Sequence, residues 1–391
     1  MAMWTTLCTY PPFFGCQWHG LQRSLTVTCM QDDNTQRDSM TDQIAHFPQT
    51  ALRTTADDKF GIPHDYLRQS LEDTKQHTAQ QCADFSARLY KSRNLVFTCI
   101  TALKLSAVEL PWCNLPQDEF HILASSDNKR SHVSSARFMV WTHSIEAMQS
   151  ITIDDRKIWF TDPITTWAIM AKFLSQDEVI VLADAICRAK PQGIPLQKQD
   201  FTDYLTMDER FIGKRKCRDA LPFIGTPLDS SMEMRCVIAL LRFGLPRPET
   251  GYPIVITTLN RTVHVDMAYP EFHVIIEYDG DAHRLDKAQH RWDERKREAL
   301  RTMGYTVIVV FADTFSSQQR TREFAENVAQ ALGVDLPGIP LEPYTALLND
   351  QLLAEDRLRQ RRCRARKGAN SPWGKGCLSF RLINTPGICG L

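Results

Sequence analysis

The most regular pattern of hydrophobic and polar positions lies in the last third of the chain, between residues 230 and 332. A helix begins at the capping residue Ser230, contains the apolar run 237–241 and stops at Gly244-Leu245-Pro246. It is followed by predicted strands at 254–258, 261–267 and 272–278, a helix at 287–303, a strand at 306–311 and a helix at 316–332. This order, αβββαβα, predicts an α/β unit over residues 230–343, with a mixed sheet flanked by helices.

A second patterned region, residues 76–212, predicts a separate α+β unit. Asp162-Pro163 is a typical helix start, and Ser175 with Glu178 forms a capping box before another amphipathic helix. The segment 151–160 contains two adjacent aspartates between β-rich flanks and predicts a hairpin. We expect Trp167 in the hydrophobic core of this unit.

The remaining segments have little hydrophobic periodicity. Residues 1–75 are rich in Thr, Gln, Asp and Ser and predict a disordered extension. Residues 213–229 begin with a short basic run and predict a linker. Residues 344–391 contain an arginine-rich run and predict a basic tail, whose alternatives are a solvated tail and a polyanion-binding segment.

Composition narrows the class of protein. The 391 residues contain 46 basic and 46 acidic side chains, so any basic surface must be local. The 12 cysteines form no Cys-x-x-Cys pair, and no run approaches the about 18 apolar residues of a membrane span. The first residues lack the basic and apolar regions of a signal peptide. We therefore expect a cytoplasmic protein with no membrane partner.

Three carboxylates of the last unit are arranged in a way that predicts a metal site. Asp266 ends one predicted strand, and Glu277 and Asp279 stand two positions apart on the next, so they share a face of the sheet. If these strands form a hairpin, Asp266 converges with the other two. Such oxygen ligands suit Mg²⁺ or Mn²⁺, which activate water for attack on a phosphodiester.

Four ordered blocks of this unit resemble the very-short-patch-repair-like endonuclease domain of the restriction-endonuclease-like PD-(D/E)XK superfamily. They are residues 265–270, 274–283, 292–300 and 304–310. The resemblance implies a restriction-endonuclease-like core, with Asp266 as the central metal ligand, Glu277 as the second and His283 as an active-site histidine. Glu233 matches the acidic residue of the first helix.

The chain departs from the superfamily pattern at Asp279, because the superfamily usually has a lysine there that stabilises the developing charge. Lys296 or Arg297 on the next helix could compensate for that missing lysine. Each candidate also has a structural alternative. Glu233 completes a capping box with Ser230, Asp279-Gly280 is a common turn pair, and an isolated histidine such as His283 is more often structural.

The helix at 287–303 carries the candidate nucleic-acid contacts. These are Arg291, Arg295, Lys296 and Arg297, although acidic residues alternate with them and a solvated face with i, i+4 pairs is the alternative. The first unit, through Thr161–Ala171 and Asp184–Arg188, weakly resembles the middle region of AbiEi-type antitoxins.

Two functions remain open from the sequence. One is a metal-dependent DNA endonuclease or nickase, and the other is a non-catalytic DNA-binding regulator of a toxin–antitoxin or defence locus. No phosphate loop or dinucleotide motif is present, so we expect no nucleotide cofactor. Restriction-type folds often cut as dimers, which leaves a homodimer open.

Overall fold

The computed structural model describes residues 62–88, 95–126, 133, 135–145, 147–190, 193, 195–206, 210–225, 228–280 and 287–348. All of them belong to one compact unit, Ala56–Leu391. The described residues contain two sheets flanked by helices, so the mixed α/β class predicted from the sequence is confirmed. No helix within these ranges is long and apolar enough to cross a membrane.

The first sheet has five strands in the order β3-β2-β1-β5-β4. Its strands are β1 (Val96–Phe97), β2 (Phe120–Ala124), β3 (Ala136–Val140), β4 (Met148–Ile153) and β5 (Arg156–Thr161). Strands β4 and β5 form the predicted antiparallel hairpin. The turn residues Asp154 and Asp155 have φ values of +47° and +62°, and two positive φ values are what a tight two-residue hairpin requires.

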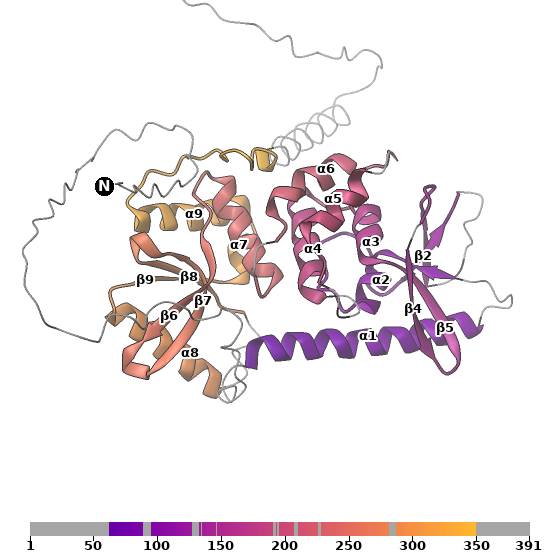
Figure 1. Cartoon of the computed structure of the whole chain (residues 1–391), viewed down its shortest axis with the longest axis horizontal. Helices are drawn as coiled ribbons and strands as arrows, with labels where there is room; N and C mark the ends of the chain where they lie inside the picture. Colours follow the sequence, from indigo (N-terminus) through magenta and orange to yellow (C-terminus); the bar gives the residue numbers. More distant parts are fainter. Residues whose placement is uncertain are drawn as a thin grey trace, which may run out of the picture. The chain divides into compact units, whose positions relative to one another are not determined.

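Within the described ranges, six helices accompany this sheet. They are α1 (Ile62–Arg88), α2 (Cys99–Leu105), α3 (Pro163–Met170), α4 (Gln176–Ala189), α5 (Lys198–Thr206) and α6 (Lys214–Ala220). The C-terminal half of α1 packs against β5, where Cys82 contacts the cluster that contains Ile158 and Phe160 (Figure 1). The predicted helix starts are confirmed: Asp162 caps α3 through the amides of Ile164 and Thr165, both at 3.0 Å, and Ser175 caps α4. Trp167 is fully buried, as expected.

The second sheet has four strands in the order β6-β7-β8-β9. Its elements are α7 (Ser231–Arg242), β6 (Glu249–Ile256), β7 (Arg261–Tyr269), β8 (Val274–Tyr278), α8 (Lys287–Thr302), β9 (Thr306–Val310) and α9 (Gln318–Leu332). The first two pairings are antiparallel and β8–β9 is parallel. The predicted element order, αβββαβα, and the mixed sheet are therefore confirmed.

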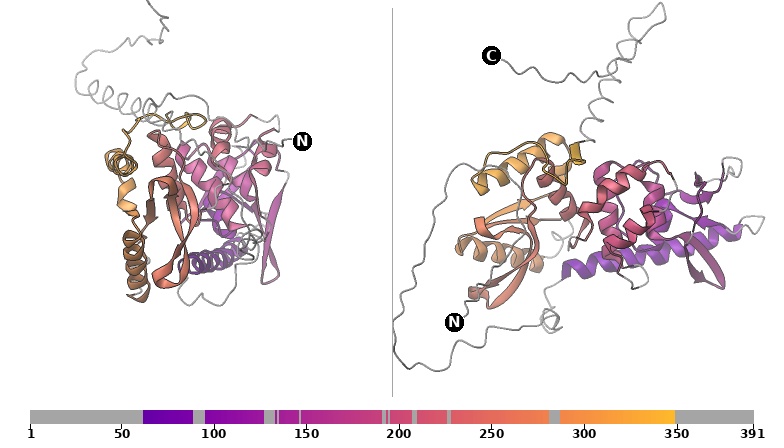
Figure 2. Two further views of the ribbon diagram at one scale, coloured as in Figure 1. Left: turned by 60° about the vertical axis from the view of Figure 1, so that its left-hand side comes forward. Right: turned by 45° about the horizontal axis from the view of Figure 1, so that its top comes forward.

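Helices cover both faces of this second sheet. Leu300 of α8 packs with Ile275 in one apolar cluster, whereas Phe324 of α9 joins Ile276 in another. Figure 1 and the right-hand view of Figure 2 show α8 and α9 on opposite sides of the strands. Alternate residues of β8 therefore point into different layers, which directs Glu277 to the same side as Ile275 and α8.

Two of the expected boundaries differ in the structure. Helix α1 begins at Ile62, so the end of the expected extension 1–75 is helical, whereas residues 1–61 lie outside the described ranges. Residues 214–220 of the expected linker 213–229 form α6, with Cys217 buried. One basic residue there has structural partners: Lys216 Nζ donates to the carbonyls of Leu174 at 2.5 Å and Ala171 at 3.3 Å, which satisfies acceptors just beyond α3. The expected tail lies outside the described ranges from residue 349 onward.

One hydrophobic core joins the two halves of the described structure. It contains Val179 and Ile180 of α4, Val237 and Ile238 of α7, and Ile276 of β8. The sequence patterns of the two halves are separate, but their buried faces meet. Helix α7 consequently packs on α4 as well as on its own sheet.

Candidate functional site

The pairing of β7 with β8 brings Asp266 and Glu277 together. The register joins Met267 to Ile276 and Ala268 to Ile275. Asp266 and Glu277 are the next residues beyond these pairs, and the charge of Glu277 acts on Asp266. Asp266 Oδ2 accepts a hydrogen bond from the Tyr278 amide at 2.8 Å, which fixes this carboxylate at the end of the strand pair. The predicted hairpin is thus present, and it places the two proposed metal ligands side by side.

Helix α8 places two cations against these carboxylates. Lys296 Nζ forms an ion pair with Glu277 Oε1 and donates to the His264 carbonyl at 3.2 Å. The Arg297 guanidinium lies 3.6 Å from Glu277 Oε2 and 3.0 Å from Asp279 Oδ2. Side chains of Glu277 and Arg297 are each only 7% exposed, so this charge cluster is largely shielded from water.

Asp279 lies one residue beyond the end of β8. Its amide donates to the Val310 carbonyl at 2.8 Å, which extends the β8–β9 ladder by one residue. Its carboxylate and that of Glu277 both contact Arg297, so the two side chains share a face as predicted. The chain beyond Gly280, including the proposed histidine His283, lies outside the described residues until 287.

Glu233 makes the capping contacts considered for it from the sequence. Its Oε1 accepts from Ser230 Oγ at 2.8 Å, its Oε2 accepts from the Asp229 amide at 3.0 Å, and Ser230 Oγ in turn accepts from the Glu233 amide. The capping interpretation is therefore confirmed. The charge of Asp266 also acts on the Glu233 carboxylate, so the start of α7 lies near the end of β7.

Burial shifts the ionisation of these acids. Loss of hydration, followed by repulsion from Glu277, raises the pKa of Asp266 above the usual range of an aspartate. Loss of hydration, followed by repulsion from Asp266, likewise raises the pKa of Glu233. Acidic groups crowded in this way favour a bound proton, and a cation that binds between them would displace it.

Asp266 and Glu277 have the carboxylate oxygens that could hold a hard divalent cation. No group of three or more His, Cys, Asp and Glu side chains within the described ranges is arranged to hold a metal ion. Mg²⁺ commonly takes only one or two carboxylates and completes its shell with water and phosphate oxygens. The pair of Asp266 and Glu277 fits that preference, although Lys296 then competes with the cation for Glu277.

The four basic residues expected to contact nucleic acid divide into two pairs. Arg291 and Arg295 are exposed on the outer side of α8, whereas Lys296 and Arg297 turn inward to the carboxylates. Beside the exposed pair, the Arg261 guanidinium lies 5.2 Å from the Trp292 ring centroid. The sequence did not indicate this contact, because it joins the start of β7 to α8 across about thirty residues.

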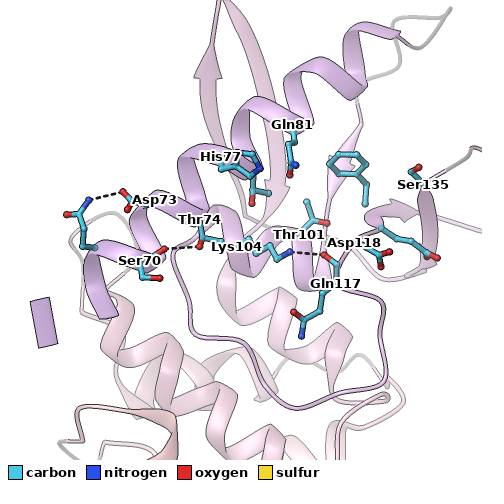
Figure 3. Close-up of a pocket in the computed structure, with 14 residues that line it drawn as sticks. Ser70, Asp73, Thr74, His77, Gln81, Thr101, Lys104, Gln117, Asp118 and Ser135 are labelled. Atoms are coloured by element: carbon cyan, nitrogen blue, oxygen red, sulfur yellow. Dashed lines mark hydrogen bonds between the residues drawn. The ribbon is translucent and has the colours of Figure 1, made fainter. Parts of the chain in front are cut away.

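A cavity of about 830 Å³ lies elsewhere, between α1, α2 and the segment before β2. Polar side chains line most of it, including Asp73, His77, Lys104 and Asp118 (Figure 3). Lys104 Nζ is bound to the Gln117 carbonyl at 2.7 Å. None of the carboxylates on β7, β8 or α7 lines this cavity, so it is separate from the candidate metal centre.

Comparison with known proteins finds two similar chains, and no activity is stated for either of them. Uncharacterized proteins MT2308 and Rv2248 of Mycobacterium tuberculosis, from strains CDC 1551 / Oshkosh and ATCC 25618 / H37Rv, are each 24% identical over 153 residues. The match covers 39% of this chain and 55% of the relative, so the chain spans about half the length of the curated relatives it matches. No protein-family model matches the chain, and no solved structure matches it.

Proposed function

We propose that this protein is a metal-dependent DNA endonuclease or nickase that hydrolyses phosphodiester bonds in defence or DNA repair. The observation that carries the proposal is the neighbouring pair of Asp266 and Glu277, with Lys296 bound to Glu277. The pair stands at the end of a strand hairpin within an αβββαβα unit. This combination provides hard metal ligands and a cation in one shielded cluster.

Asp266 and Glu277 would hold Mg²⁺ or Mn²⁺, which would supply Lewis-acid stabilisation of developing negative charge and lower the pKa of water. The other residues have distinct roles. The Tyr278 amide orients Asp266, and Arg297 holds Glu277 and Asp279 on one face. Lys296 supplies a positive charge near the phosphate. In the superfamily, a lysine at the position of Asp279 supplies this charge. His283 remains the histidine assigned by the resemblance.

DNA would approach along the exposed edge of α8. Arg291 and Arg295 point outward there, while the neighbouring cations face the carboxylates. Contacts from such arginines to phosphates give affinity without reading sequence and weaken as salt rises. The outward face of α8 would therefore bind DNA, and its inward face would take part in the chemistry.

A catalytically inactive DNA-binding regulator is the second candidate, and one observation favours it. Arg297 and Lys296 already pair with Glu277 and Asp279, so two of the carboxylates are balanced without a metal. In that case the nuclease-like unit would act as a platform in a toxin–antitoxin or defence locus. It would bind DNA in a salt-dependent manner and cleave none.

Cleavage of supercoiled plasmid and of single-stranded DNA, with Mg²⁺, Mn²⁺ or EDTA, separates these two candidates. The parent is compared with Asp266→Ala and Glu277→Gln, and with Asp313→Asn as a matched control. Asp313 is an exposed carboxylate paired with Arg320, outside the site. We expect metal-dependent nicking that both site variants lose and the control retains, with all four chains folded by circular dichroism. A folded parent that binds DNA but cleaves neither substrate would establish the regulator instead.

A further inference from the structure

Helix α7 is held by the first half of the molecule as well as by its own sheet. Arg235 makes a two-pronged ion pair with Glu178 of α4, at 2.9 and 2.7 Å, and both side chains are at most 7% exposed. Trp112 stacks on the Arg235 guanidinium at 3.8 Å and donates its amide to the same glutamate at 2.7 Å. Nearer the C-terminal end of α7, Arg242 pairs with Asp177 of α4.

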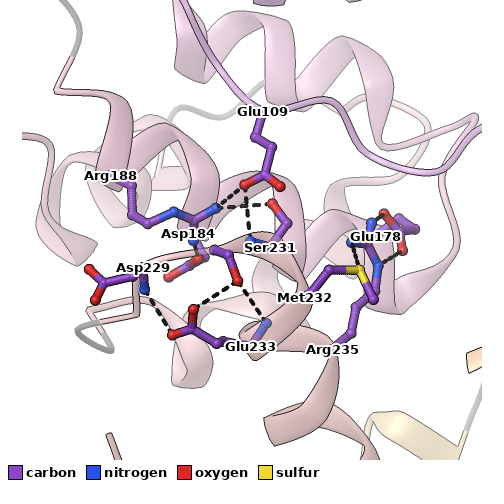
Figure 4. A network of polar contacts seen from close by, with 10 residues as sticks. Glu109, Glu178, Asp184, Arg188, Asp229, Ser231, Met232, Glu233 and Arg235 are labelled. Carbon is purple, nitrogen blue, oxygen red and sulfur yellow. Dashed lines mark hydrogen bonds and ion pairs between the residues drawn. The ribbon is translucent and has the colours of Figure 1, made fainter. Parts of the chain in front are cut away.

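The first turn of α7 has its own attachment, made by Glu109 and Arg188. Glu109 Oε2 accepts from the Ser231 amide at 3.0 Å and from Arg188 Nη2 at 2.9 Å. Arg188 Nη2 also donates to Ser231 Oγ at 3.0 Å, and Arg188 Nη1 pairs with Asp184. Figure 4 shows this group beside Glu233, whose carboxylate is hydrogen-bonded within the same turn.

The contacts join the first half of the molecule to the first turn of α7, and the charge of Asp266 acts on Glu233 in that turn. The Ser231 amide is one of the donors left free at a helix start, and a carboxylate there satisfies it and complements the helix dipole. Glu109 therefore fixes the position of the turn that carries Glu233. The position of this turn also sets the position of the Glu233 carboxylate. The charge of Asp266 acts on that carboxylate.

We propose that Glu109, together with Arg188, is a positioning residue that holds the first turn of α7 and thereby sets the position of Glu233. This inference rests on the proposed nuclease function for its effect on metal and DNA. Residues that orient a metal site without touching the metal typically change affinity or activity about 10- to 100-fold when replaced. We expect Glu109→Ala to weaken Mn²⁺ binding and slow cleavage by about that factor.

The test uses the full chain and three variants. Glu109→Ala removes the acceptor, Glu109→Gln retains an acceptor for the Ser231 amide but not the ionic pair, and Asp177→Asn is the control. Asp177 joins the same two helices through Arg242, but it does not touch the first turn. Three quantities are measured on each chain: hydrogen exchange of peptides covering 229–236, Mn²⁺ affinity by calorimetry, and the cleavage rate at saturating DNA.

The expected result is faster exchange at 229–236 and weaker Mn²⁺ binding in Glu109→Ala, an intermediate effect in Glu109→Gln, and neither effect in Asp177→Asn. Unchanged exchange in Glu109→Ala overturns the proposal, as does a loosened turn with parental Mn²⁺ affinity and cleavage. A parent that neither binds Mn²⁺ nor cleaves DNA refutes the nuclease function, and the exchange measurement then decides alone whether Glu109 holds the turn.

Discussion

Replacing Lys296 by methionine gives a sharp test of the site, because metal affinity and cleavage should change in opposite directions. Lys296 Nζ is bound to Glu277, and the lysine side chain is only 14% exposed. Methionine keeps an apolar stem of similar length and removes the charge. A divalent cation then no longer competes with the ammonium group for the glutamate oxygen.

The magnitudes follow from that contact. Two unit charges about 4 Å apart interact by about 4 kcal/mol at the effective dielectric near a protein surface, and partial exposure and the remaining Arg297 reduce this. A net gain of about 1.4 kcal/mol would tighten Mn²⁺ binding about tenfold. The loss of one preorganised group that stabilises developing charge costs about 10²- to 10³-fold in turnover. We therefore expect tighter Mn²⁺ binding with cleavage almost abolished.

Calorimetry with Mn²⁺ and single-turnover cleavage at saturating metal measure the two effects. Arg301→Met is the matched control, because Arg301 is an exposed residue of the same helix that contacts only Glu298 among the ion pairs described. The control should match the parent in both assays. If Lys296→Met weakened Mn²⁺ binding, or cleaved at the parental rate, Lys296 would not be the charge that replaces the missing superfamily lysine.

Two further predictions concern stability. Because the folded state raises the pKa of Asp266, it retains a proton that the unfolded chain has already lost, so stability falls as pH rises from the ordinary carboxyl range through neutrality. Asp266→Asn removes that titration. Thermal unfolding should therefore show a larger gain in Tm over the parent at pH 8 than at pH 5. An equal gain at both pH values would contradict this prediction. Arg235→Met leaves Glu178 buried without its partner, which costs about 3–5 kcal/mol and lowers Tm on the order of 10 °C, whereas a second change, Glu178→Gln, should recover part of the loss. A fall of less than about 2 °C would show that the pair is not buried in solution.

Local sequence patterns predicted the helices and strands well, because helix caps and tight turns depend on residues close together in the sequence. The turn at Asp154 and Asp155 needs only the residues beside it, and Asp162 and Ser175 cap helices through amides two or three positions away. The proximity of Asp266 and Glu277 was also accessible, since a short connection fixes the register of an antiparallel pair.

Long-range partners were not accessible from the sequence. The basic run at 214–218 resembled a linker because its acceptors, the carbonyls of Ala171 and Leu174, are about forty residues away. From the sequence, Arg297 could either contact nucleic acid or compensate for the missing lysine, and the orientation of α8 on the sheet shows that it faces Glu277 and Asp279. The attachment of α7 to Glu109 joins positions more than a hundred residues apart.

The shared core around α7 has a consequence for how this protein could evolve. One side of the helix matches α4 in both apolar shape and charge, and the other side matches its own sheet. A recombination event between α4 and α7 would pack one of these helices against the surface of an unrelated protein. Arg235 or Glu178 would then be buried without its partner. The two halves are therefore expected to be inherited as a pair, with substitutions on α4 accompanied by substitutions on α7.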